Sequence, residues 1–92
     1  MKVYDESEVH EKLNDLKDWS YSDKSIEKTF EVNDFASALA FTLKAGIEAE
    51  KADHHPDILI HSWNKVKITL STHSEGGVTD KDFDLALKIE KI

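Results

Sequence analysis

The one proline of the chain, Pro56, separates two stretches whose hydrophobic residues repeat with different periods. Before it, residues 34–52 carry apolar side chains at helical spacing. After it, residues 65–73 alternate between apolar and polar side chains, as a strand does. Proline disfavours helical geometry at the residue before it, so the helix is expected to end ahead of His54 and His55. This change of period constrains the fold more than any other feature of the sequence.

Seven elements are expected in the order helix, strand, strand, helix, strand, strand, helix. Their approximate ranges are residues 5–16, 19–21, 25–32, 34–52, 58–60, 65–73 and 80 to near the C-terminus. Thr79 and Asp82 form a capping-box pattern before the last helix. Two hairpins separated by a long helix predict an α+β fold of two layers, with a four-stranded antiparallel sheet and three helices on one face. With 92 residues, the chain is expected to form a single domain, residues 1–92.

The long helix carries an apolar stripe that is expected to face the protein core. The stripe consists of Phe35, Leu39, Leu43, Gly46 and Ile47. We expect Asn33 to cap this helix at its N-terminus. One further step along the stripe reaches Glu50, so this carboxylate is expected to face the core or a pocket beside it. The last helix is expected to contribute Phe83, Ala86 and Leu87 to the core.

Charge and composition exclude several classes of function. The chain has 19 acidic and 12 basic residues and a net charge of −7, which disfavours direct binding to nucleic acid or to an anionic membrane. It has no cysteine, so disulfides, thiolate metal sites and a cysteine nucleophile are excluded. No apolar run approaches the length of a membrane span, and the N-terminus lacks the apolar stretch of a signal peptide. We expect a soluble, cytoplasmic protein, and the thin core of so short a chain favours a homo-oligomer.

Three of the five histidines fall into one small constellation. His54 and His55 follow the long helix, His73 follows the second hairpin, and Glu50 lies shortly before the histidine pair. We expect the helix exit, the end of the hairpin and the turn before the last helix to meet around a pocket. Imidazole titrates near neutral pH, so such a cluster can transfer protons or bind a metal ion. Taken alone, the histidine pair is also consistent with turn residues that satisfy helix-end carbonyls, and His73 with an exposed strand residue.

A compound motif points to one family. It consists of Glu50-x-x-x-His54-His55-Pro56-Asp57, Trp63-Asn64-Lys65-Val66, Leu70-Ser71-Thr72-His73 and Gly77-Val78-Thr79-x-x-Asp82. In its order and spacing this set closely resembles the pterin-4a-carbinolamine dehydratase family. The segment between Pro56 and Trp63 is slightly longer than in the vertebrate members, which leaves the pocket rim and the preference for the substrate's side chain open.

The resemblance implies a function and a set of site residues. Family members dehydrate 4a-hydroxytetrahydropterins, such as 4a-hydroxytetrahydrobiopterin, to quinonoid dihydropterins without a metal or cofactor, and so recycle the pterin of aromatic amino acid hydroxylases. The implied catalytic residues are His54, His55, His73 and Glu50. The implied substrate contacts are His54, His55, Pro56, Thr72, His73, Ser74 and Glu75. Members are homodimers or homotetramers, and the vertebrate ones also serve as a dimerisation cofactor of a homeodomain transcription factor.

Some alternatives remain open in the sequence. Asp82 is the third residue of a capping box, and we favour this structural role over direct chemistry. Glu50 is either an exposed helix carboxylate or, as we favour, the group that orients an imidazole. Three histidines and a glutamate can in principle hold zinc, although neighbouring histidines in a turn often cannot reach one ion together. A non-catalytic interaction module on the same fold would not need all of these side chains.

Overall fold

The computed structural model describes residues 1–92 and contains three α-helices, two short 3₁₀ helices and four strands. In chain order the elements are α1 (Glu6–Lys12), η1 (Leu13–Asp15), β1 (Ser20–Ser22), β2 (Ser25–Glu31), α2 (Phe35–Ala52), β3 (Asp57–His61), β4 (Lys65–Leu70), η2 (His73–Glu75) and α3 (Asp80–Glu90). Apart from the two 3₁₀ turns, this is the order that the sequence predicts. None of the helices combines the length and the apolarity needed to cross a membrane.

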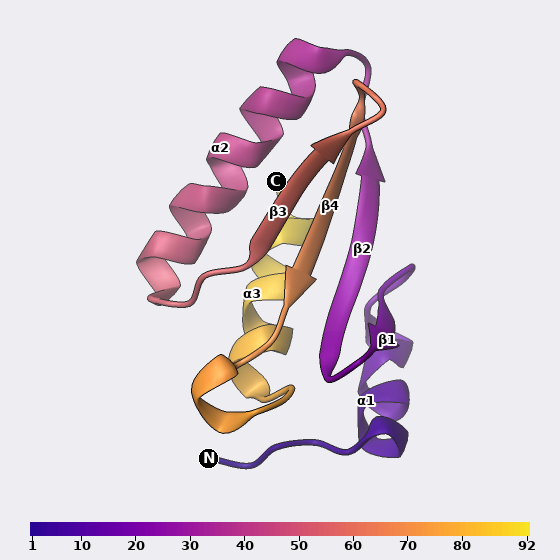
Figure 1. Ribbon diagram of the computed structural model, residues 1–92, viewed down its shortest axis with the longest axis vertical. Coiled ribbons are helices and arrows are strands. Elements are labelled where there is room, and N and C mark those ends of the chain that lie inside the picture. The colour runs from indigo at the N-terminus through magenta and orange to yellow at the C-terminus, as the bar shows by residue number, and fades with distance from the viewer.

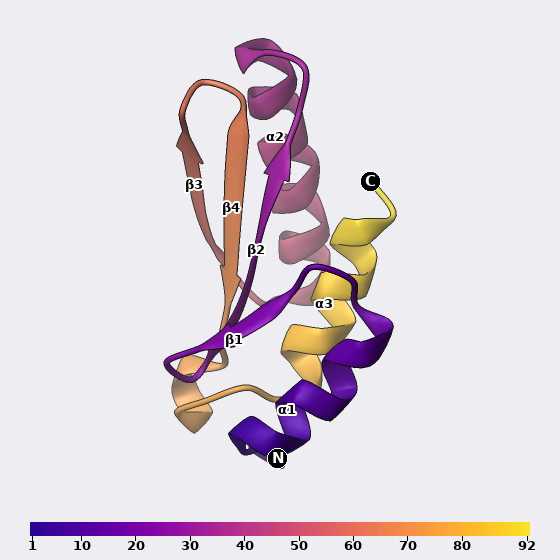
Figure 2. The ribbon, with the colours of Figure 1, turned by 90° about the vertical axis from the view of Figure 1, so that its right-hand side faces the viewer.

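The four strands form one antiparallel sheet in the order β1-β2-β4-β3 (Figure 1). One hairpin contains β1 and β2, the other contains β3 and β4, and the pairing of β2 with β4 joins the hairpins. Figure 2 shows all three α-helices on the same side of the sheet. The predicted fold class, a two-layer α+β fold with helices on one face of a four-stranded antiparallel sheet, is therefore confirmed.

The core lies between the sheet and the helices. Val66, Ile68 and Leu70 of β4 are fully buried and alternate with half-buried residues, as the pattern of the sequence predicts. The other buried apolar residues are Val9, Leu16, Trp19, Ile26, Ala38, Ala45, Ala49, Val78, Phe83, Leu85, Ala86 and Ile89. Leu87 was expected in the core but is 45% exposed. Leu85 takes the buried place instead, because it lies on the face of α3 that packs inward.

The apolar stripe of α2 faces solvent, contrary to the expectation from the sequence. The exposed residues are Phe35, Leu39, Leu43 and Ile47, and the buried residues of the helix are Ala38, Ala45 and Ala49. The side chain of Glu50 is also exposed and does not face the core. Small alanine side chains let α2 lie close to a sheet whose larger residues already fill the interface. Hydrophobic periodicity identifies an apolar face but does not tell whether the sheet or another molecule covers it.

The N-terminal cap of α2 is Asp34 rather than Asn33. The Asp34 carboxylate accepts a hydrogen bond from the backbone N–H of Ser37 at 2.7 Å. A carboxylate at this position both satisfies a free N–H group and interacts favourably with the positive end of the helix. The charged neighbour therefore takes the role that the sequence analysis gave to the amide.

The segment after β4 forms a tight loop and not a continuation of the strand. β4 ends at Leu70, whereas the alternation in the sequence extends to His73. Thr72 forms an isolated antiparallel bridge with Gly77, and η2 fills the loop between them. Gly76 ends η2 with a left-handed backbone, at φ 76°, which glycine adopts without steric cost. His73 therefore projects from a loop beyond the end of the sheet.

α2 ends in a Schellman motif that sets the direction of the histidines after it. Asp53 has a left-handed backbone, at φ 51°, and its N–H donates to the carbonyl of Glu50 at 3.2 Å. The N–H of His54 donates to the carbonyl of Ala49 at 3.1 Å. His54 and His55 therefore occupy the exit turn of the helix, as the position of the proline predicts.

Candidate active site

A polar hollow of about 230 Å³ lies where the α2 exit, the loop after β4 and the start of α3 meet. It is lined by Asp53, His54, His55, Ser71, Thr72, His73, Ser74 and Lys81. None of the lining residues is hydrophobic. The structure thus brings His73 to the same hollow as His54 and His55, although the whole β3–β4 hairpin separates them in the sequence. The three segments meet as the two-hairpin topology requires.

His54 is held in place by a buried carboxylate. Its Nε2 lies 2.6 Å from Oδ1 of Asp82, and these residues are 8% and 0% exposed. The other carboxylate oxygen, Oδ2, accepts the backbone N–H of Thr79 and the hydroxyl of Thr72, each at 2.9 Å. Asp82 completes the capping box of α3, as the sequence predicts, and it also contacts His54. The helix cap therefore explains the hydrogen bonding of Oδ2 of Asp82 but not that of Oδ1.

The directions of these hydrogen bonds follow from counting protons. The backbone N–H of Lys81 donates to Oγ1 of Thr79 at 3.3 Å. The Asp82 carboxylate can only accept, so it takes the one proton of Thr72, and Thr79 is therefore the donor in the 2.7 Å contact between the two hydroxyls. Thr72 in turn donates its proton to Asp82. Because these donors surround a carboxylate that can only accept, Nε2 of His54 is also a donor. The four side chains form one ordered chain of hydrogen bonds.

This chain of hydrogen bonds fixes the tautomer of His54. With its proton on Nε2, a neutral imidazole has an unprotonated Nδ1. Nδ1 makes no hydrogen bond within the chain and is not among the buried polar atoms that lack a partner. In this neutral form His54 keeps a free hydrogen-bond acceptor, and the residue lines the hollow, where an acceptor can take a proton from a ligand.

His55 is held much more loosely than His54. Its Nε2 lies 3.1 Å from Oε1 of Glu50, and the two side chains are 65% and 81% exposed. Glu50 thus contacts an imidazole, but from the solvent side of the helix. Water and salt screen such exposed pairs, so the contact orients His55 only weakly.

His73 enters the hollow from the loop after β4. It is exposed, it begins η2, and its ring makes no hydrogen bond within the chain. Ser74 lines the hollow beside it. The structure contains no group of three or more His, Asp or Glu side chains placed so that they could share a metal ion.

The structure places the predicted site residues in three groups. Those that line the hollow are His54, His55, Thr72, His73 and Ser74, those that contact a histidine from behind are Glu50 and Asp82, and those that do neither are Pro56 and Glu75. Three further lining residues, Asp53, Ser71 and Lys81, were not among the predicted site residues, although Asp53 and Ser71 lie in the helix exit and hairpin end that were expected to form the pocket. Each directly adjoins a predicted residue in the sequence. They could have been predicted from the sequence by including the immediate neighbours of the motif residues.

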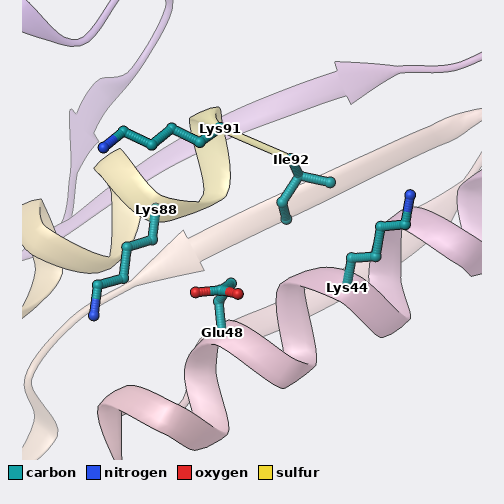
Figure 3. A pocket seen from close by; sticks show the side chains of 5 residues that line it. All are labelled: Lys44, Glu48, Lys88, Lys91 and Ile92. Atoms are coloured by element: carbon teal, nitrogen blue, oxygen red, sulfur yellow. The ribbon is translucent and has the colours of Figure 1, made fainter.

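A larger hollow lies between α2 and the end of α3, away from the histidines. It has a volume of about 340 Å³ and is lined by Lys44, Glu48, Lys88, Lys91 and Ile92 (Figure 3). Figure 3 shows the three ammonium groups pointing in different directions, with the Glu48 carboxylate between Lys88 and Ile92. A binding site needs polar groups that converge on a ligand, so the histidine hollow is the better candidate although it is smaller.

Comparison with known proteins identifies the family of the chain. The sequence model of the pterin 4 alpha carbinolamine dehydratase family matches residues 2–92. The chain belongs to this family. A relative from Sulfolobus acidocaldarius is 46% identical over 88 residues and covers 96% of each chain. Another, from Roseiflexus castenholzii, is 48% identical over 90 residues, which are 98% of this chain and 96% of the relative. Both are provisionally named pterin-4-alpha-carbinolamine dehydratase.

Two solved structures share the fold. A crystal structure from Brucella melitensis, described as a transcriptional coactivator/pterin dehydratase, is 39% identical with a TM-score of 0.89 and covers 98% of this chain and 97% of that chain. A pterin dehydratase-like protein identified as a RuBisCO assembly factor in the alpha-carboxysome has a TM-score of 0.63 and covers 79% of this chain and 83% of that chain. At 19% identity, the second likeness shows the fold alone. The family expected from the compound motif is thus confirmed.

Proposed function

We propose that the protein dehydrates a 4a-hydroxytetrahydropterin, such as 4a-hydroxytetrahydrobiopterin, to the quinonoid dihydropterin and water. In this reaction the C4a–O bond breaks, the neighbouring ring nitrogen N5 loses its proton, and a C4a=N5 double bond forms. The departing hydroxyl takes up a proton and leaves as water. The reaction therefore needs one group that accepts a proton and another that donates one.

The observation that carries this proposal is the 2.6 Å contact between Nε2 of His54 and the buried carboxylate of Asp82. Asp82 accepts the proton of Nε2, so a neutral His54 has a free acceptor at Nδ1, and the residue lines the hollow. In the proposed mechanism, Nδ1 of His54 takes the proton from N5 as general base. A positioned general base typically contributes a rate factor of ~10²–10⁴.

The proposed general acid is His73. Its ring has no partner within the chain and lines the same hollow, so an imidazolium there is free to donate a proton to the departing hydroxyl. We assign His55 to substrate binding, with Glu50 orienting it, because this exposed pair lies at the rim. Ser74 is proposed to bind the substrate directly, while Pro56 and Glu75 shape the loops that carry the lining residues.

The proposal includes the setting in which the protein works. Residues 1–92 act as one domain, in the cytoplasm, as a homodimer or homotetramer, and the reaction uses no metal or cofactor. The pterin is the only small-molecule partner that the proposal requires. The exposed apolar stripe of α2 supports self-association, since a stripe of this kind on a soluble helix normally meets another apolar surface.

The test is the rate at which the purified protein dehydrates a 4a-carbinolamine generated in the cuvette, followed by ultraviolet absorbance. We expect a rate well above that of buffer, unchanged by prior treatment with a strong chelator. A rate equal to that of buffer rejects the proposal. Loss of activity on chelation and its return with zinc would favour the zinc site in place of acid–base chemistry by the histidines.

A second candidate function is a non-catalytic interaction module on the same fold. The observation that favours it is the exposed stripe of α2, because Phe35, Leu39, Leu43 and Ile47 are 46–66% exposed. A module of this kind would keep its binding partner when the histidines are replaced. The dehydratase requires those histidines, so variants of the histidines separate the two functions.

A further inference from the structure

Thr72 lies at the centre of the buried chain of hydrogen bonds, between the start of α3 and His54. Its hydroxyl donates to Oδ2 of Asp82 at 2.9 Å and accepts from Oγ1 of Thr79 at 2.7 Å. Thr72 is only 3% exposed, and both of its partners are fully buried. A hydroxyl whose one proton is already donated within the protein cannot donate it to a substrate.

We propose that Thr72 is a positioning residue, which holds the Asp82 carboxylate in the orientation that keeps the proton of His54 on Nε2. Its catalytic effect rests on the proposed function, whereas its effect on the tautomer does not. This role differs from the substrate contact that the family resemblance implies for Thr72. The residue acts on the reaction through Asp82 and His54 and does not touch the reacting atoms.

Two hydrogen-bond donors are needed to fix the orientation of the Asp82 carboxylate, because a single donor would leave it free to rotate. The N–H of Thr79 fixes Oδ2 from the backbone of the helix start, at 2.9 Å. The hydroxyl of Thr72 reaches the same oxygen from the loop after β4. Donors from two different elements hold the plane of the carboxylate, so that Oδ1 faces His54. In a buried site such bonds are stronger than in water, and an unpaired partner is costly.

The Asp82 carboxylate sets the direction of the Thr72 hydroxyl. Because a carboxylate can only accept, the single proton of Thr72 points at Oδ2 of Asp82. Thr79, whose Oγ1 also accepts the N–H of Lys81 at the start of α3, is then the donor in its contact with Thr72. Formation of the helix cap and selection of the His54 tautomer are therefore parts of one network.

The test combines kinetics with nitrogen-15 NMR of the histidine ring nitrogens. Thr72→Val removes the hydroxyl at nearly constant volume and is expected to lower kcat by about tenfold with KM changed less than about twofold, the effect of one hydrogen bond to a charged group. Thr72→Ser restores the hydroxyl and is expected to restore kcat. Thr69→Val is the control: it makes the same exchange at a half-buried position of β4, outside the network, and is expected to leave kcat unchanged.

The NMR measurement does not depend on enzymatic activity. In the wild-type protein His54 is expected to show the Nε2–H tautomer alone, and in Thr72→Val a mixture with the Nδ1–H form. A wild-type spectrum dominated by the Nδ1–H form overturns the proposal, even if the valine variant does not fold. Unchanged kcat and tautomer in a folded valine variant also overturn it. A wild-type protein without dehydratase activity but with the expected tautomer shift rejects the proposed function and leaves the role of Thr72 standing.

Discussion

At the scale of single residues, the two carboxylates that contact histidines differ in their surroundings. Asp82 is fully buried and its oxygens have three donors, whereas the side chain of Glu50 is 81% exposed and contacts His55 alone. A buried charge–dipole contact is not screened by water, and an exposed one is. We therefore expect Asp82 to determine the chemistry of its histidine and Glu50 to have little influence on its own.

Asp82→Asn tests this expectation with almost no change of shape. The remaining carbonyl oxygen still accepts from Thr79 and Thr72, so the new NH₂ group faces Nε2 of His54 and forces the proton onto Nδ1. The free acceptor is lost, and kcat is expected to fall by ~10²-fold or more. Steady-state kinetics measure this, and circular dichroism checks that the fold is kept. A folded variant with wild-type kcat would contradict the assigned role of His54.

Glu50→Gln makes the same carboxylate-to-amide substitution as Asp82→Asn, but at the exposed carboxylate. We expect kcat/KM to change less than about threefold, because an exposed pair contributes little. The same assay and the same protein concentrations apply. A loss as large as that of Asp82→Asn would show that the reaction depends on Glu50 as much as on Asp82, and would contradict the minor role given to the exposed carboxylate.

At the scale of elements, the start of α2 depends on the ionised form of Asp34. The side chain and the backbone of Ser37 donate hydrogen bonds that hold the pKa of the Asp34 carboxyl below its usual value. A carboxyl whose pKa is lower in the folded state than in the unfolded state stabilises the folded state while it is ionised. This contribution is present above pH of about 4 and is lost as the pH falls through the folded-state pKa.

Asp34→Ala is therefore expected to lower Tm at neutral pH, and the difference from the wild type is expected to shrink below pH of about 4. Thermal unfolding followed by circular dichroism from pH 7 down to about 3 measures the difference. Asp84→Ala on α3 removes the same charge from an exposed position without a hydrogen-bonding partner, and serves as the control. A difference for Asp34→Ala that stays constant with pH would show that its charge does not contribute to the cap.

The elements themselves could largely be predicted from the sequence, because they depend on local chemistry. Pro56 ends α2 before the histidines, the alternation of Val66, Ile68 and Leu70 gives β4 its buried face, and Thr79 caps α3. The face that α2 turns to the sheet could not be predicted in this way. That choice depends on how much space the residues of β2 and β4 leave for the helix, which is a property of the packed layers.

At the scale of the whole molecule, the exposed stripe of α2 predicts self-association. Leu43 is 66% exposed, and the strand β3 at the edge of the sheet carries Leu59, which is 56% exposed. We expect light scattering to give a mass above the 10.5 kDa of one chain at micromolar concentration. Leu43→Glu is expected to lower that mass, because it places a charge in an apolar interface.

Leu87→Glu is the control for this experiment, since Leu87 is an exposed leucine of α3 outside the stripe. It is expected to leave the mass of the assembly unchanged. A wild-type protein with the mass of a monomer would show that the stripe does not join copies of this chain. An assembly that survives Leu43→Glu would place the interface on another surface.

Only part of the site could be predicted from the sequence. The histidines were recognisable from their motif, and the structure brings all three to one hollow. The resemblance also marked Asp82 as a possible site residue and Thr72 as a substrate contact, but the contact of Asp82 with His54 could not be predicted. A capping box has the same appearance in the sequence whether or not its carboxylate also reaches a histidine. That contact exists because the α2 exit packs against the start of α3, far away along the chain.

The most direct test of the central claim is kcat for 4a-carbinolamine dehydration by His54→Ala relative to the wild type, with the fold of both checked by circular dichroism. If Nδ1 of His54 is the general base in this hollow, kcat falls by ~10²-fold or more while the fold is kept. A folded His54→Ala protein that dehydrates the substrate as fast as the wild type would contradict the account.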